Sequence, residues 1–139
     1  MLKKRIKYTD YNGNVREEDF YFNFTKAEVM EWEMGIDGGM SAMLDRIVQL
    51  QDIKKIKDTF KEIILKSYGE KSLDGRTFIK SEELSKNFMS TEAYSELVME
   101  LLLDPNKAAD FINAIVPKVD GQNVIAPVPS NNFNPPISN

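Results

Sequence analysis

The chain has 139 residues, of which 42% are hydrophobic and 29% are charged, and its formal net charge is −4. This length suits one domain with a core of its own, and the acidic balance argues against non-specific nucleic-acid binding, which needs a basic surface. The sequence contains no Cys and no His, which excludes disulfides, thiolate nucleophiles, Cys/His zinc sites and histidine-dependent catalytic triads within this chain.

The N-terminal part has the pattern of a β-hairpin. Apolar residues alternate in 2–8 and again in 20–24, and the turn sequence DYNGN occupies 10–14 between them. The alternating Asp and Asn side chains also suggest a calcium-binding loop, but an EF-hand needs glycine at its sixth position and an acid at its twelfth. Here Gly13 is fourth and Tyr21 is twelfth, so we predict a turn and no metal site.

Two registers are open for this hairpin. A two-residue turn would place Ile6 opposite Asp19, an apolar side chain against an acid. A three-residue loop with a left-handed Gly13 instead pairs Leu2 with Phe22 and puts Ile6 on the same face as the phenylalanines. We favour the three-residue loop, because it gives the hairpin one apolar face.

The first helix is predicted from about Thr25 to Met34. Thr25 and Glu28 have the spacing of a capping box, and Phe24 and Val29 have that of a hydrophobic staple. A second helix is expected at about 40–50.

A third, strongly amphipathic helix follows at 52–69. Its apolar stripe consists of Ile53, Ile56, Phe60, Ile63, Ile64 and Ser67. Gly69 has the place of a C′ glycine, which predicts the end of this helix there.

Three more helices have recognisable starts. The fourth begins at Ser81, the fifth is capped by Ser90 or Thr91, and the sixth begins at Asp104 with Pro105 in its first turn. The apolar stripe of the fifth helix contains Tyr94, Leu97, Val98, Leu101 and Leu102, and that of the sixth contains Ala108, Phe111, Ile112, Ile115 and Val116. With the hairpin, these six helices predict a mainly helical α+β fold.

Residues 66–83, between the third and fourth helices, contain two glycines, as a phosphate-binding loop would. The spacing of Gly69 and Gly75 fits neither the Walker motif nor the dinucleotide fingerprint, and Asp74-Gly75 is typical of a turn. We therefore predict a connector between two helices.

The sequence contains two pairs of adjacent acidic residues, but neither pair can bring its two carboxylates to one substrate atom. Glu17 and Glu18 would point to opposite faces of a strand, and Glu82 and Glu83 diverge around a helix. The sequence therefore predicts a protein that is not an enzyme, with no catalytic, cofactor-binding or metal-binding residues.

The segment around the only tryptophan is rich in methionine. It contains Met30, Trp32, Met34, Met40 and Met43. Methionine side chains adapt to varied apolar partners, so this segment is a candidate protein-binding surface. Packing of the methionines between the first two helices is the ordinary alternative, and we prefer it.

Composition changes at Pro117. Residues 118–139 are rich in Pro, Asn and Ser and have no helical period, which predicts a flexible tail after a domain at 1–117. Val124, Ile125 and Phe133 are apolar residues within this tail that could dock on a groove or sheet edge. An inert tail is the equally open alternative.

Four short segments occur in a distinctive order: SYG at 67–69, RTFIKS at 76–81, TEAYSEL at 91–97 and FINAIVP at 111–117. The sequence that contains them, from about Tyr8 to Pro117, resembles the tail assembly chaperones of long-tailed bacteriophages. This resemblance implies a small, mainly helical, non-enzymatic protein.

The resemblance also implies partners. Such proteins bind the long, helical and aggregation-prone tape measure protein, keep it soluble and help tail tube subunits gather on it. A second copy of the chain is a further expected partner, whereas nucleic acid and membrane are not. We expect the protein in the cytoplasm of the bacterial host and not in the finished virion. The alternatives are a head–tail connector or completion protein of the virion and a small host-directed adaptor.

Overall fold

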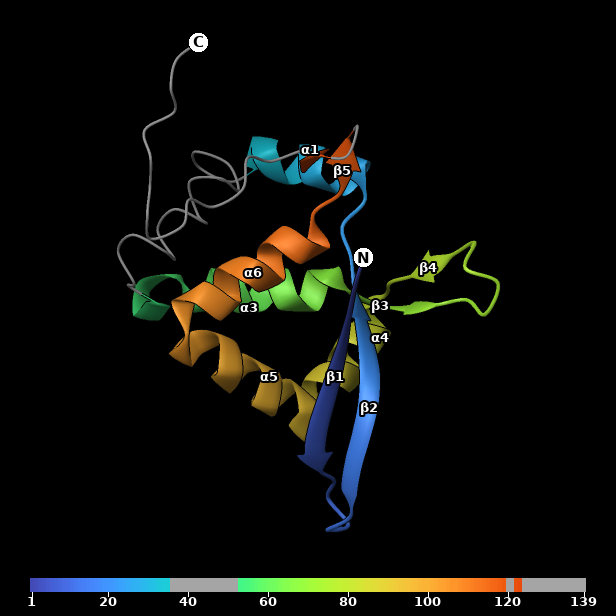
Figure 1. The fold of residues 1–139 in the computed structure, drawn as a ribbon, viewed down its shortest axis with the longest axis vertical. Coiled ribbons are helices and arrows are strands. Elements are labelled where there is room, and N and C mark those ends of the chain that lie inside the picture. Colours follow the sequence, from blue (N-terminus) through green and yellow to red (C-terminus); the bar gives the residue numbers. More distant parts are fainter. Residues whose placement is uncertain (36–52, 120–121, 124–139) are drawn as a thin grey trace.

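The computed structural model describes residues 1–35, 53–119 and 122–123, with the backbone alone for 32–35, 53–56, 59, 118–119 and 122–123. Its elements in chain order are β1 Leu2–Thr9, β2 Val15–Phe22, α1 Lys26–Gly35, α3 Ile53–Ser67, β3 Tyr68–Lys71, β4 Phe78–Ile79, α4 Glu82–Met89, α5 Glu92–Leu103, α6 Pro105–Ile115, β5 Lys118–Val119 and β6 Gln122–Asn123. The predicted α+β class is confirmed (Figure 1). The helix predicted at 40–50 lies outside the described residues.

The first hairpin has the three-residue loop that we favoured. Leu2 pairs with Phe22, Gly13 has a φ of 86°, and the Asp10 N–H donates to the Asn14 carbonyl at 2.8 Å. Ile6 is buried on the face that β1 and β2 turn towards the helices. In this register Ile6 lies opposite Glu18. Hydrophobic alternation therefore specified the register through the shared face of Ile6, Phe20 and Phe22, which the other pairing would have divided between two faces.

The predicted C′ glycine at Gly69 is wrong. The chain passes directly from α3 into β3, where Gly69 pairs with Tyr21 of β2. The last carbonyl of α3, that of Ser67, accepts a hydrogen bond from the Asn23 N–H at 2.8 Å. A backbone donor from another segment thus satisfies the helix end, and no left-handed residue is needed there.

The predicted connector at 66–83 therefore contains two strands. β3 and β4 pair antiparallel and extend the sheet to the order β1-β2-β3-β4. The turn between them contains Gly75 with a φ of 77°, so the predicted Asp74-Gly75 turn is confirmed.

The helix starts follow their predicted caps. At α1 the Thr25 N–H donates to the Glu28 carboxylate at 2.8 Å and the Glu28 N–H donates to Thr25 Oγ1 at 3.2 Å, which completes the capping box. Ser81 caps α4, Thr91 caps α5 and Asp104 caps α6.

The core lies where the β1–β2 hairpin meets the helices. Phe88 of α4 is at its centre, stacked on Tyr68 with ring centroids 4.3 Å apart and edge-on to Phe22 at 5.7 Å. The apolar stripes of the helices complete it, with Phe60, Ile63, Ile64, Leu97, Val98, Leu101, Ala108, Phe111, Ile112, Ile115 and Val116 buried. These residues confirm the buried faces that were predicted for α5 and α6. They also confirm the described part of the buried face predicted for α3.

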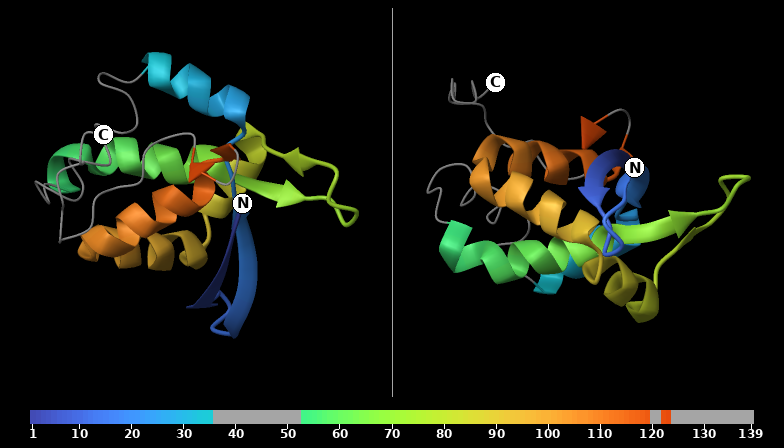
Figure 2. Two further views of the ribbon diagram at one scale, coloured as in Figure 1. Left: turned by 45° about the horizontal axis from the view of Figure 1, so that its top comes forward. Right: turned by 90° about the horizontal axis from the view of Figure 1, so that it is seen from below.

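Figure 1 shows α3, α5 and α6 as a group of helices whose ends meet the long β1–β2 hairpin, with α1 lying across the top of the view. The β3–β4 hairpin projects away from this junction, and the rotated views in Figure 2 show the same projection. Near the C-terminal end of the described chain, β5 and β6 form a separate two-stranded ladder.

Candidate functional site

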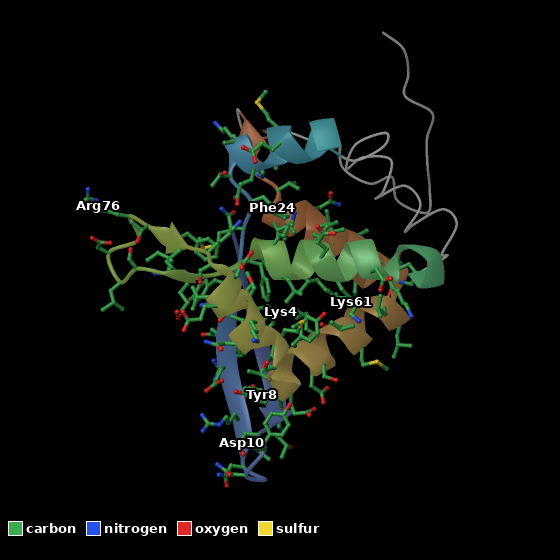
Figure 3. The ribbon with its side chains drawn as sticks, turned by 180° about the vertical axis from the view of Figure 1, so that it is seen from behind. Lys4, Tyr8, Asp10, Phe24, Lys61 and Arg76 are labelled. Carbon is green, nitrogen blue, oxygen red and sulfur yellow. The ribbon has the colours of Figure 1, made fainter. Side chains whose placement is uncertain are left out.

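An open groove of about 860 Å³ lies among the described residues. Its walls come from α1, α3, α4 and the residues just before α4, and Tyr94 of α5 contributes to it. The apolar residues that line it, here called its floor, are Phe24, Leu65, Met89 and Tyr94. Figure 3 labels Phe24, which lies just below α1 in that view, and Lys61 of α3.

Met89 is the most exposed part of this floor. Its side chain is 45% exposed at the end of α4, whereas the neighbouring Phe88 is only 2% exposed. The helix thus turns one aromatic side chain into the core and one flexible thioether into the groove. Such a side chain can adapt to differently shaped apolar partners.

An ion pair bridges one end of the groove. Lys80 Nζ lies 2.9 Å from both carboxylate oxygens of Glu28, and it also lies 4.7 Å from the centre of the Phe24 ring. The ammonium therefore holds the start of α1 to the segment before α4. Its aliphatic stem covers part of the apolar floor.

Burial and pairing shift the protonation of this pair. Burial raises the pKa of Glu28, but hydrogen bonds from Lys80 and from the Thr25 N–H outweigh it and hold that pKa below its ordinary value. Burial lowers the pKa of Lys80, and Glu28 opposes only part of this effect. The carboxylate is therefore stabilised in its charged form, while the ammonium bears a desolvation cost.

The remaining charges of the rim alternate in sign. Along α3 they are Asp58, Lys61, Glu62 and Lys66, and Glu62 pairs with Lys66 at 3.1 Å. An apolar floor between rows of mixed charge is the surface that an amphipathic helix can occupy.

Metal sites and membrane-spanning helices are two further features to consider among the described residues. Among the described residues no group of three or more acidic side chains is placed to hold a metal ion. Within the same residues no helix combines the length and the hydropathy needed to cross a bilayer.

Of the predicted protein-binding residues, only the Met30 side chain is described. It is 65% exposed on α1 but does not line the groove, which α1 borders with Glu28 and Glu31. Trp32 and Met34 belong to α1, but their side chains lie outside the described residues. Met40, Met43, Val124, Ile125 and Phe133 also lie outside them. For all eight residues, Met30 included, binding stays a prediction.

The sequence interpretation missed the groove residues. Leu65 belongs to α3, whose described buried face was predicted correctly, but it lies beside that face. Met89 belongs to α4, for which the sequence pattern predicted only the helix start and no buried face. The only signal for Met89 was its position directly before the break between α4 and α5. No local pattern indicates that Lys80 pairs with Glu28, 52 residues earlier in the chain.

Comparison with known proteins identifies the family of this chain. A family model described as "Phage tail assembly chaperone" matches residues 1–125. Neither the curated proteins nor the solved structures gave a significant match. Tail assembly chaperones are not a known class of enzymes, and their family implies interaction with other phage tail proteins. Since the match covers most of the chain, this protein belongs to the phage tail assembly chaperone family.

Proposed function

We propose that this protein binds the tape measure protein of a long-tailed phage, keeps it soluble and helps to recruit tail tube subunits to it. The observation that carries the proposal is the family match over residues 1–125. The protein would act in the cytoplasm of the infected bacterium and be absent from the mature virion. A second copy of the chain remains a proposed partner.

The groove supports this proposal physically. A long helical protein that aggregates must expose apolar stripes, and a holdase has to cover such stripes reversibly. The floor of Phe24, Leu65, Met89 and Tyr94 offers apolar area, and the mixed rim can pair with charges of either sign. We infer that a helical segment of the tape measure protein lies in this groove.

The methionine segment extends the proposal. Met30 is exposed on the helix that borders the groove, and Trp32, Met34, Met40 and Met43 follow it closely in the chain. We propose that they enlarge the binding surface, and that Val124, Ile125 and Phe133 dock on the same partners.

Co-expression tests the function. The full-length chain, produced together with the tape measure protein of the same phage, should increase the soluble fraction of that protein measured after centrifugation. Unchanged aggregation with the chain present would refute the proposal. Detection of the chain at stoichiometric levels in purified virions would favour a structural component instead.

A pair of methionine variants tests the groove. Met89→Glu places a charge on the apolar floor and should weaken binding of the tape measure protein about tenfold, which corresponds to 1.4 kcal/mol. Met99→Glu is the matched control, because Met99 is 52% exposed on α5 and does not line the groove. Equal binding by both variants, with unchanged thermal unfolding, would place the contact elsewhere while leaving the chaperone function intact.

A further inference from the structure

The outer edge of β1 is an unpaired strand edge. The Asp10 N–H donates to Asn14 across the hairpin, and antiparallel pairing alternates from there, so the even-numbered residues of β1 exchange hydrogen bonds with β2. The backbone groups of Lys3, Arg5 and Lys7 consequently point away from β2. Among the described residues none of these groups has a backbone partner.

Such an edge is a template for another strand. β1 is eight residues long, and a row of free N–H and C=O groups can add a strand by main-chain hydrogen bonding. Lysine on an edge strand is also a common guard against unwanted pairing. The surroundings of the edge decide between these two roles.

A hollow of about 330 Å³ lies against the N-terminal half of this edge. Its apolar walls are Leu2 of β1, Leu101 of α5, and Phe111 and Ala114 of α6. The Lys4–Glu100 ion pair, at 2.8 Å, borders it. A strand added beside β1 would direct every second side chain towards this hollow, because alternate residues of a strand face the same side.

The other face of β1 is basic. Lys3, Arg5 and Lys7 have exposed side chains on the face away from the core. Arg5 lies 3.2 Å from Asp19 and 3.5 Å from Glu17 of β2, whereas neither lysine has a salt bridge within the described residues. Two cations on the edge therefore lack a partner there.

We propose that the outer edge of β1 binds an extended segment of another polypeptide in which acidic side chains alternate with apolar ones. The acids lie opposite Lys3, Arg5 and Lys7, and the apolar side chains enter the hollow. This inference does not depend on the proposed binding of tape measure protein in the groove, since it concerns a different surface.

A second copy of the chain does not fit this edge. Antiparallel pairing of two β1 strands about Arg5 would set Arg5 against Arg5 and Lys3 against Lys7. Like charges directly opposite each other destabilise strand pairs. The charge pattern thus selects an acidic strand over self-pairing.

Amide hydrogen exchange tests the proposal on the full-length chain. The probe is a capped synthetic peptide of eight residues, the length of β1, in which Glu and Leu alternate. Its binding should slow exchange at the amides of Lys3, Arg5 and Lys7 more than about tenfold. The amides of Lys4 and Ile6 already bond to β2 and should change little.

Two substitutions of one residue separate the backbone from the charge. Arg5→Pro removes the outward N–H of residue 5. Because the β1–β2 ladder does not use this N–H, proline is acceptable at this position of the edge strand. Arg5→Ala removes the same guanidinium but keeps the N–H. Arg5→Pro should therefore bind the peptide at least about tenfold more weakly than Arg5→Ala, with similar thermal unfolding of the two variants.

Several results would overturn the proposal. Equal affinity of Arg5→Pro and Arg5→Ala, or no slowing of exchange with the peptide, would leave the lysines as an edge guard only. Equal binding of the same peptide with Lys in place of Glu would refute the charge selection. Slow exchange at Lys3, Arg5 and Lys7 without peptide would mean that the chain itself, or a second copy, covers the edge.

Discussion

The carboxyl group of Glu28 serves three structural purposes at once. It accepts the Thr25 N–H in the capping box of α1, it pairs with Lys80, and it borders the groove. A single side chain thus joins a local helix start to a contact between segments that are 52 residues apart.

The Glu28–Lys80 pair should make stability depend on pH in the acid range. The pKa of Glu28 is lowered on folding, so its contribution is present above the ordinary value of 4.5 and is lost as the pH falls through the folded value. The lowered pKa of Lys80 means that its ionisation disfavours folding. Because lysine stays protonated throughout the acid range, it does not change how the free energy of unfolding varies with pH there.

Glu28→Gln isolates this effect, since glutamine can still accept the Thr25 N–H. The wild type should be more stable than Glu28→Gln by about 1 kcal/mol near pH 7, a value that allows for the partial exposure of the carboxylate. The difference should shrink towards zero near about pH 3. Urea unfolding at both pH values measures it, and a difference that stays constant would contradict the assigned ion pair.

At the scale of elements, β3 depends on a close approach. A Cβ atom on Gly69 would lie 2.7 Å from the Ile79 carbonyl oxygen and 2.8 Å from the Phe78 ring. The glycine therefore lets β3 pair with β2 and β4 without a clash. Its role is steric, because its φ is not positive.

Gly69→Ala should destabilise the protein by about 1–3 kcal/mol, since the backbone oxygen of β4 cannot move away without loss of strand pairing. Gly75→Asn is the matched control. Gly75 has a φ of 77° and open space around it, and asparagine tolerates this conformation. Urea unfolding of both variants should show a large loss only for Gly69→Ala. Similar losses would mean that the turn, and not the close approach, limits the hairpin.

At the scale of the whole molecule, the described part of the hydrophobic core ends at Val116. The buried apolar side chains of the described residues all lie between Ile6 and Val116. The Phe24 N–H donates to the Ile115 carbonyl at 2.9 Å, which joins the segment before α1 to the end of α6. The predicted domain boundary after residue 117 agrees with this distribution but stays a prediction.

A chain that ends after residue 117 should keep the thermal unfolding midpoint of the full-length protein, because it loses none of these core side chains. Circular dichroism during heating measures the midpoint. The family match extends to residue 125, and β5 and β6 lie between these two limits. The midpoint of the shorter chain could instead be lowered by several degrees and be restored in a chain that ends after residue 125. That result would move the domain boundary to the end of the family match.

Local sequence patterns were sufficient to predict the parts of the fold that depend on neighbouring residues. Hydrophobic alternation and Gly13 specified the hairpin register, and Thr25, Ser81, Thr91 and Asp104 specified the helix starts. These features are local, because a cap or a tight turn satisfies backbone groups only a few residues away. The order of short motifs also indicated the family.

How those elements meet depends on contacts between segments that are far apart in the chain. Gly69 has the local pattern of a helix end but lies in a strand, because Tyr21 of a distant strand pairs with it and the Asn23 N–H satisfies the end of α3 at Ser67. The groove likewise combines Phe24, Leu65 and Met89 from separate elements. Which side chain lines a groove depends on the packing of segments far apart in the chain, and no pattern within a single segment contains that information.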